Sequence, residues 1–437
     1  MQTIAQNIRW YRSQFDEFEK SLNGEKTNYI HTLRRDAIQR FSELGFPTNR
    51  QEDWRFINIA PITSKEFKPV FRYDSKGIKK QDLQKYLIDK AIQLVFIDGM
   101  FSPEYSTNNA AAQKSYTDSL SAALIKNTVE IKSNLGRQVT GTENAFTALN
   151  AAFLQDGAYV SIPAGVKLEH PIQFLFVATD SQNIYTTQPR NLVVVNTDAQ
   201  LNIIETYVGL GENTYLTNSV SEVFIAEGAK VEYDKFQIES PNSYHIGTLN
   251  IKMGNSSQFI SNAFSFGGAI VRNNITAMLD AEGSECTLNG LSLGKGQQIV
   301  DNHTAIDHAK PNCQSHELYK AILDGESRGI FNGKIFVRKD AQKTDAKQTN
   351  RTLLLSDNAT INAKPQLEIF ADDVKCTHGA TIGQLDADQL FYLRSRGIDL
   401  SSARAILTTA FAGDVINRVR IESLRNQLDQ VIQESLL

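Results

Sequence analysis

The feature that most restricts the fold of this chain is a strand-and-turn unit that recurs from about residue 159 onward. Each copy has a short apolar run, a turn of two or three residues, one small residue and a second alternating run. The clearest copies span residues 160–168, 193–201, 223–231, 251–259, 278–286 and 353–361. In four of them the small residue is Ala199, Ala229, Ser257 or Ser284, at successive spacings of 30, 28 and 27. Strands repeated at such a period predict a solenoid or a propeller.

A parallel β-helix fits this repeat better than a propeller does. A propeller blade needs about 40–45 residues and carries Gly-His and Trp-Asp marks, which the repeat lacks. Two to four strands in about 30 residues instead fit one coil of a β-helix, in which alternate side chains stack on the next coil. Each open end of such a helix exposes unpaired backbone, so we expect it to be capped or to pair with a partner.

The chain on either side of the repeat has the periodicity of helices. Near the N-terminus the apolar residues Tyr11, Phe15 and Phe18 recur at spacings of three or four, which places them on one helical face. We therefore predict a mainly β protein with helical ends. Its regions are a helical and mixed region over 1–140, a parallel β-helix core over 141–383 and a helical region over 384–437.

Three amphipathic stretches make up the predicted C-terminal region. Asp386 is placed to cap the first helix, and Ser401 or Ser402 the second. The third is expected over roughly 414–435. Because these helices lie outside the repeat, they either cap the β-helix or dock a partner, and the sequence favours neither.

The composition excludes several classes of protein. The 45 Lys and Arg against 49 Asp and Glu leave a net charge of −4, which argues against binding to nucleic acid through phosphates. Three Cys are too few for a disulfide scaffold and fit a reducing compartment. The charged N-terminal stretch does not resemble a secretory signal, and no run of 18 apolar residues predicts a membrane span. We therefore expect a cytoplasmic protein.

Two groups of residues are candidates for metal binding. His303, His308, Cys313 and His316 fall within 14 residues, but their spacing matches no zinc pattern. Alternate residues of a strand also face opposite ways, so we favour polar side chains satisfied on the coil surface. Cys376 and His378 form a Cys-x-His pair, which in a strand would lie on one face and could share one metal ion. A packed thiol is the alternative for Cys376.

The sequence contains no recognisable catalytic motif. Asp372 and Asp373 are adjacent, so in a strand they would face opposite ways and make a poor acid/base pair. The Gly-rich stretch at 293–296 lacks the frame of a phosphate-binding loop, and no nucleophile elbow is present. We therefore predict that the chain is not itself an enzyme.

Several long stretches of the chain, taken in order, form a recognisable set. They are KPNCQSHELYK (310–320), SRGIFNGK (327–334), DAQKTD (340–345), KPQLEI (364–369), ADDVKCTHGAT (371–381) and LFYLRSRGI (390–398), with QEDWR (51–55) and NAFTALN (144–150) upstream. Together these stretches resemble the SufB/SufD family of iron–sulfur cluster assembly proteins, with a closer likeness to the SufD side.

The resemblance implies both a fold and a function. It implies a right-handed parallel β-helix that pairs edge to edge with a SufB-like homologue and docks a SufC-like ATPase on helices at about 386–437. His378 matches the family histidine implicated in cluster formation at that interface, and Cys376 lies beside it. No cofactor would be bound stably, because the cluster would be transient and shared with the SufB-like chain. The isolated chain could form a homodimer.

Two other functions remain as alternatives. The first is a β-helix carbohydrate-active enzyme, against which the missing carboxylate cluster and signal peptide count. The second is a purely structural partner that stabilises the SufB-like chain and recruits the ATPase.

Overall fold

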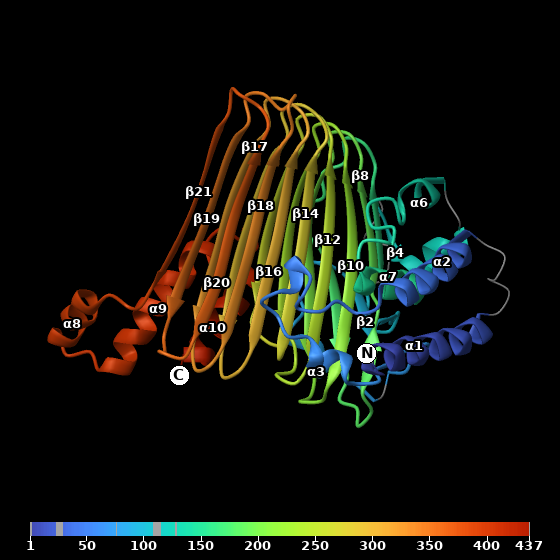
Figure 1. The fold of residues 1–437 in the computed structure, drawn as a ribbon, viewed down its shortest axis with the longest axis horizontal. Coiled ribbons are helices and arrows are strands. Elements are labelled where there is room, and N and C mark those ends of the chain that lie inside the picture. Colours follow the sequence, from blue (N-terminus) through green and yellow to red (C-terminus); the bar gives the residue numbers. More distant parts are fainter. Residues whose placement is uncertain (1, 23–28, 76, 108–114, 127–128, 437) are drawn as a thin grey trace.

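Two long sheets, stacked face to face, form the body of the molecule (Figure 1). The computed structural model describes residues 2–22, 29–75, 77–107, 115–126 and 129–436. The first sheet has the order β20 (Thr360–Ile369), β18 (Arg328–Val337), β16 (Ile299–His308), β14 (Ile270–Leu279), β12 (Tyr244–Met253), β10 (Tyr215–Ile225), β8 (Arg190–Val195), β5 (Ala158–Ile162) and β4 (Tyr116–Ser119), with β7 (Tyr185–Thr187) and β1 (Lys68–Pro69) beside it. The second has the order β21 (Lys375–Gly383), β19 (Asp345–Leu354), β17 (Gln314–Leu323), β15 (Glu285–Gly294), β13 (Gln258–Ser265), β11 (Lys230–Ile238), β9 (Gln200–Gly209), β6 (Ile172–Ala178), β2 (Ile92–Ile97) and β3 (Met100–Phe101).

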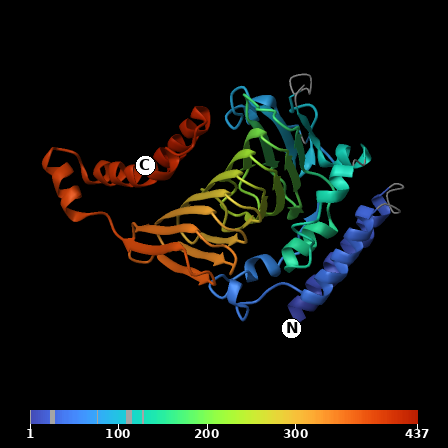
Figure 2. The same ribbon diagram turned by 90° about the horizontal axis from the view of Figure 1, so that it is seen from above.

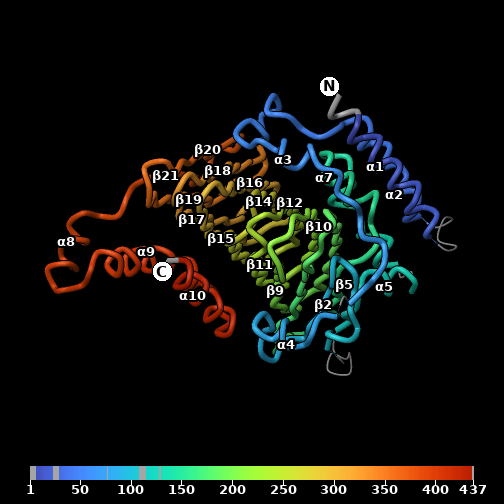
Figure 3. The backbone as a smooth tube through the Cα atoms, turned by 90° about the horizontal axis from the view of Figure 1, so that it is seen from below, coloured from blue at the N-terminus to red at the C-terminus, as the bar shows by residue number. Residues whose placement is uncertain are grey.

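From β8 onward consecutive strands alternate between the two sheets, so each coil adds one strand to each sheet (Figure 3). From β8 to β21 every strand pairs in parallel with the strand of the next coil, as in β10 with β12 and β17 with β19. This arrangement confirms the predicted parallel β-helix. It contains two long strands per coil, the lower end of the predicted number.

The small residue of the repeat lies inside the turn that leads into the second sheet. Ala199, Ala229, Ser257 and Ser284 are each fully buried, directly before β9, β11, β13 and β15. The copy at 353–361 does not belong to this series of turns, because it joins β19 to β20 and so leads from the second sheet to the first. Cys313 instead occupies the next place in the series, directly before β17, and is fully buried.

Helices cover the molecule on opposite sides (Figure 2). The N-terminal part of the chain contributes α1 (Gln2–Ser21), α2 (Tyr29–Leu44), η2 (Glu52–Trp54), α3 (Ala60–Thr63), α4 (Lys80–Gln84), α5 (Leu120–Lys126), α6 (Val129–Asn134) and α7 (Ala145–Ala152). Tyr11, Phe15 and Phe18 of α1 are buried in a cluster that also holds Phe146 of α7 and Leu216 of β10. The predicted helical face of the N-terminal region is therefore a core face.

The C-terminal helices are α8 (Ala387–Ser395), α9 (Leu400–Ile416) and α10 (Glu422–Leu436). Asp386 caps α8 as predicted, but α9 is capped by Asp399, whose carboxylate accepts the Ser402 N–H at 3.0 Å. The stretch expected to form one helix over 414–435 is broken between α9 and α10.

The end of α9 and the whole of α10 pack on the outer face of the second sheet. Val415, Val419 and Leu428 are fully buried there against Phe236 and Leu291 of the sheet. The first helix, α8, differs because it has no buried residue. None of the helices that the structure describes is both long and apolar enough to cross a membrane.

A buried carboxyl beneath these helices makes the stability of the fold depend on pH. Asp234 on β11 accepts a hydrogen bond from Asn262 Nδ2 at 2.7 Å, but its Oδ2 has no hydrogen-bond partner among the described residues. Burial, with help from the charge of Glu232, raises the pKa of Asp234 from 3.8 to about 8. The folded chain therefore holds this proton more tightly than the unfolded chain does. As a result, the free energy of unfolding falls as the pH rises from about 4 to about 8.

Replacing Asp234 by asparagine should therefore stabilise the protein at alkaline pH. The substitution keeps the acceptor for Asn262 and removes the cost of ionising the buried carboxyl. We expect the Tm to rise by about 2–4 °C at pH 9 and by less at pH 6, as measured by circular dichroism. The exposed Asp372, changed to asparagine, is the control. If D234N raised the Tm by the same amount at pH 6 and pH 9, the prediction would be contradicted.

Candidate functional site

The β-helix has an open end at its C-terminal coil. β20 and β21 stand last in the order of their sheets, so their outer edges have no strand partner within the part of the chain that the structure describes. Three large apolar side chains are exposed here, Ile369 by 39%, Phe370 by 59% and Ile382 by 53%. Unpaired strand edges beside exposed apolar groups are typical of a surface that binds another chain.

Cys376 and His378 both lie on β21, the last strand of this open end. In the register of the sheet Cys376 is opposite Ala346 and His378 is opposite Gln348, and both partners are buried on the inner face of β19. The two side chains therefore share one face of the strand, as predicted from their spacing. Cys376 is half-buried and packs beside Ala346, whereas His378 is exposed.

The environment of Cys376 keeps its thiol protonated. Burial raises the pKa of this thiol above its ordinary value, and the negative charge of Asp345 adds to the effect. A thiol binds a metal ion as the thiolate, so a metal ion that binds here must displace a proton. The raised pKa therefore disfavours spontaneous nucleophilic chemistry of Cys376 at neutral pH.

Two buried polar residues lie in line beneath His378. Gln348 on β19 is opposite His378, and Glu317 on β17 is opposite Gln348. Gln348 Nε2 donates a hydrogen bond of 2.6 Å to Glu317 Oε2. Burial raises the pKa of Glu317 to about 7.

The other histidine and cysteine cluster does not converge. His308 is buried inside the β-helix beside Ser315, 2.9 Å from its hydroxyl, and burial lowers the pKa of His308 to about 4. Cys313 is enclosed in its turn, where Sγ donates to the Ala281 carbonyl, and His316 is exposed on β17. The described residues contain no group of three or more His, Cys, Asp or Glu side chains placed to hold a metal ion.

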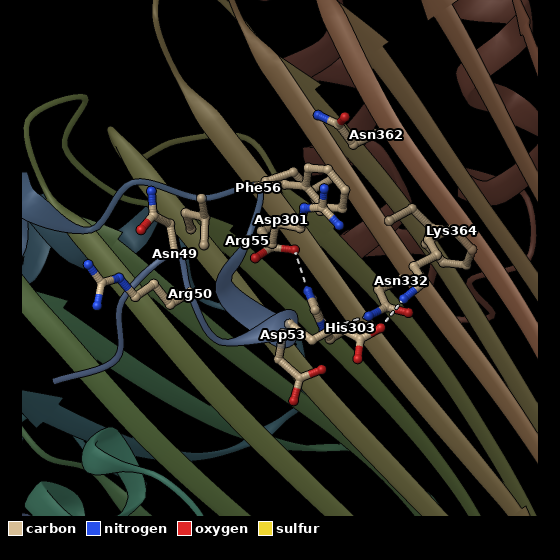
Figure 4. A pocket seen from close by; sticks show the side chains of 14 residues that line it. Asn49, Arg50, Asp53, Arg55, Phe56, Asp301, His303, Asn332, Asn362 and Lys364 are labelled. Atoms are coloured by element: carbon tan, nitrogen blue, oxygen red, sulfur yellow. Dashed lines mark hydrogen bonds and ion pairs between the residues drawn. The ribbon is translucent and has the colours of Figure 1, made fainter. Parts of the chain in front are cut away.

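His303, the fourth member of that cluster, lines a cavity of about 520 Å³ on the outer face of the first sheet (Figure 4). The segment that includes η2 covers β16, β18 and β20 there. His303 Nε2 lies 3.0 Å from Asp301 Oδ1, its Nδ1 is 3.4 Å from Asn332 Nδ2, and Lys364 pairs with Glu52. Both ring nitrogens of His303 are therefore engaged, as predicted for a satisfied polar side chain. The prediction of a surface position is wrong for His308 and Cys313, which are fully buried, and His308 Nδ1 has no hydrogen-bond partner among the described residues.

Asp372 and Asp373 also lie apart from any catalytic arrangement. Both are exposed in the turn before β21 rather than in a strand, and Asp373 pairs with Lys343. The pair links two successive turns of the β-helix.

Helix α8 forms a second exposed apolar surface. Phe391 is 75% exposed and Tyr392 is 57% exposed, although both stand in a well-formed helix that Asp386 caps. Leu400 and Ile406 of α9 add to the exposed apolar area. Large aromatic groups held outside the core on a rigid helix are typical of a protein-binding surface.

Sequence reasoning identified Cys376 and His378 but missed Gln348 and Glu317. The signal that could have found them is the repeat itself. Gln348 precedes His378 by 30 residues and Glu317 precedes Gln348 by 31, so one coil length separates each pair. The sequence shows no clear copy of the repeat between residues 287 and 352, so the register of the earlier coils does not extend from the sequence pattern to β21.

Comparisons with known proteins agree with this architecture. A family model described as "SUF system FeS cluster assembly, SufBD core domain" matches residues 176–411, and one described as "SufBD protein N-terminal region" matches residues 5–174. An iron–sulfur cluster assembly SufBD family protein of Synechocystis sp. is 33% identical over 94% of this chain and 92% of its own length. The iron–sulfur cluster assembly protein SufD of Escherichia coli is 29% identical over 90% of this chain and 89% of its own. SufD of Bacillus subtilis is 26% identical over 93% and 94%.

Proposed function

Since the chain belongs to the SufBD family of the iron–sulfur cluster assembly system, we propose that it is a SufD-like subunit of a complex with a SufB-like chain and a SufC-like ATPase. Membership of this family supports a role in iron–sulfur cluster assembly. In the proposal, the cluster forms between the two β-helices, and the ATPase drives its formation. The observation that carries the proposal is the position of His378, exposed on the last strand of an unpaired edge.

The open end has the chemistry that transient cluster binding needs. Cys376 and His378 offer one sulfur and one imidazole nitrogen on the same face of β21, too few groups to hold a cluster alone. A second chain that pairs with the edge would supply the missing ligands. The cluster is then a shared cargo that leaves when the interface opens, and no cofactor is bound stably by this chain.

The C-terminal helices are the proposed docking surface for the ATPase. α8 exposes Phe391 and Tyr392, while α9 and α10 are anchored on the second sheet through a buried apolar cluster. A force applied to α8 would therefore reach the β-helix through α9. In this arrangement ATP hydrolysis belongs to the partner, and the chain is not itself an enzyme. We place the complex in the cytoplasm, where a reducing environment keeps its thiols available.

The edge pairing can be tested with a charge at the open end. Ile382→Lys puts an ammonium group on β21, where partner contact would bury it. Because burying an unpaired charge is costly, we expect the amount of SufB-like chain that co-purifies with the tagged variant to fall at least about tenfold. Without that partner the same edge would pair with a second copy of this chain, and the variant should then be monomeric in light scattering.

The control for this experiment is Ile125→Lys. Ile125 is 82% exposed on α5, at the other end of the molecule, and the same charge there should leave co-purification unchanged. Both variants should unfold at the temperature of the wild type, because each changes an exposed side chain. Undiminished capture of the SufB-like chain by I382K would contradict pairing through this edge.

A further inference from the structure

The inner column of side chains that ends at His378 changes character along the β-helix. Successive coils place one residue each in this column, opposite one another in the register of the second sheet. From the N-terminal coil to the open end these residues are Ile203, Tyr233, Ser261, Leu288, Glu317, Gln348 and His378. The column thus becomes strongly polar only in the two coils directly beneath His378. The neighbouring column that ends at Cys376 has no such change, since it holds Cys286, Ser315 and Ala346 before it.

The side-chain amide of Gln348 is held through its nitrogen, and its oxygen is left without a hydrogen-bond partner among the described residues. Its Nε2 donates to Glu317 Oε2 at 2.6 Å, and Gln348 is only 2% exposed and Glu317 only 3%. Gln348 Oε1 is buried and has no hydrogen-bond partner within the described part of the chain. A buried acceptor without a donor is costly, and such groups call for an explanation. The residue opposite Gln348 on the next strand toward the open end is His378, whose imidazole can supply an N–H donor.

Gly333 on β18 makes room for this amide. A Cβ atom at position 333 would lie 2.4 Å from Gln348 Nε2 and 2.7 Å from the ring of Phe331. Any larger residue there would therefore displace the Gln348 side chain. Gly333, Glu317 and Gln348 come from three different strands, and together they define one position for the amide.

We propose that Gln348, held by Glu317, is the positioning residue for His378. Gln348 Oε1 accepts a hydrogen bond from one ring nitrogen of His378, and the other ring nitrogen binds the cluster. The inference rests on the proposed function, because it assigns a role to His378 as a ligand. An imidazole has two nitrogens, and a hydrogen bond to one of them decides which one is left to bind a metal. Ligating histidines almost always donate their second N–H to a carbonyl or carboxylate. Gln348 Oε1 is a carbonyl of this kind, one strand away from His378.

The test uses the full chain co-expressed with its SufB-like and SufC-like partners. Q348M removes the amide oxygen but keeps a side chain of similar length. Q348N keeps a polar amide but shortens the side chain by one methylene, which moves the oxygen away from His378. We expect both variants to form the complex, and the iron and sulfide bound per complex to fall about tenfold or more. In the cluster that remains, pulsed electron paramagnetic resonance should show a changed quadrupole coupling of the remote histidine nitrogen. That coupling depends on the hydrogen bond at the remote N–H, which a purely structural role would not alter.

Two further variants sharpen the result. E317Q still offers an oxygen to Gln348 Nε2, so it should rescue most of the cluster content that E317L loses. N350L is the matched control, because Asn350 is also buried on β19 with an unused Oδ1 but stands opposite Ala380. It should behave as the wild type.

The outcomes separate the two hypotheses. If H378A lowers the cluster content while Q348M and Q348N match the wild type in content and in nitrogen coupling, the positioning role is wrong and the proposed function stands. If H378A itself has no effect, the proposed role of His378 fails, and with it the inference. An effect of N350L as large as that of Q348M would also overturn the inference, because it would show a general response of the polar interior.

Discussion

Replacing His378 by alanine is expected to lower the iron and sulfide bound to the co-expressed complex at least about tenfold. Removing only the hydrogen-bond partner of a metal ligand already lowers metal affinity by about 10–100-fold, and this variant removes the ligand itself. The side chain is exposed at the open end, so its removal leaves the packing of the β-helix intact. We therefore expect an unchanged Tm and an unchanged yield of the complex. Iron and acid-labile sulfide analysis, with recovery of an iron–sulfur enzyme's activity in cells, measures the effect.

The control for H378A is H316A. His316 is also exposed on a strand of the second sheet, but it lies on β17, two strands in from the open edge of β21. It should leave the cluster content at the wild-type level. If H378A combined with Cys376→Ala supports normal cluster content, the chain is a purely structural partner, and the metal-binding role of both residues is wrong.

The second large effect is expected on α8. Phe391→Asp should reduce capture of the SufC-like ATPase by at least about 30-fold, because an aromatic anchor in an interface contributes about 2 kcal/mol or more. Phe391 is 75% exposed, so the change should not disturb folding. Titration of the purified ATPase onto the immobilised chain measures the affinity directly.

This prediction separates the two partners. F391D should retain the SufB-like chain, because Phe391 lies on α8, which extends beyond β21 and is not part of the unpaired strand edges (Figure 1). Val129→Asp on α6 is the matched control, because Val129 is an exposed apolar residue, as Phe391 is. This variant should bind the ATPase as the wild type does. Wild-type affinity of F391D would place the ATPase elsewhere on the chain.

The architecture could be predicted because strand alternation and the repeat are local properties of the sequence. Successive residues of a strand face opposite sides wherever the strand lies, so the shared face of Cys376 and His378 followed from their spacing alone. The repeat of small residues predicted coils, because a residue inside each tight turn must be small and buried, as Ala199 and Ala229 are. The helical periodicity of the ends was equally local.

The exact helix ends at the C-terminus were less accessible to sequence reasoning. Ser401, Ser402 and Asp399 are all good capping residues, and only the backbone path into α9 makes Asp399 the cap. The apolar pattern of 414–435 runs on through a break at Asn417, because both α9 and α10 bury their apolar faces on the same sheet. Because both helices pack on the second sheet, apolar residues recur at helical spacing in both, and the sequence pattern does not show where one helix ends.

Tertiary structure alone decided what lies next to each candidate ligand. Contacts between coils depend on register, and from β8 onward the coil length varies between 26 and 32 residues, so a small error in a turn would shift every partner. For this reason the sequence did not place Cys313 inside a turn or bring Gln348 and Glu317 beneath His378. The sequence by itself determined a β-helix with helical ends and a Cys-x-His pair on one strand face. The stacking of coils decided that this pair stands at an unpaired edge, above a buried amide with a free acceptor.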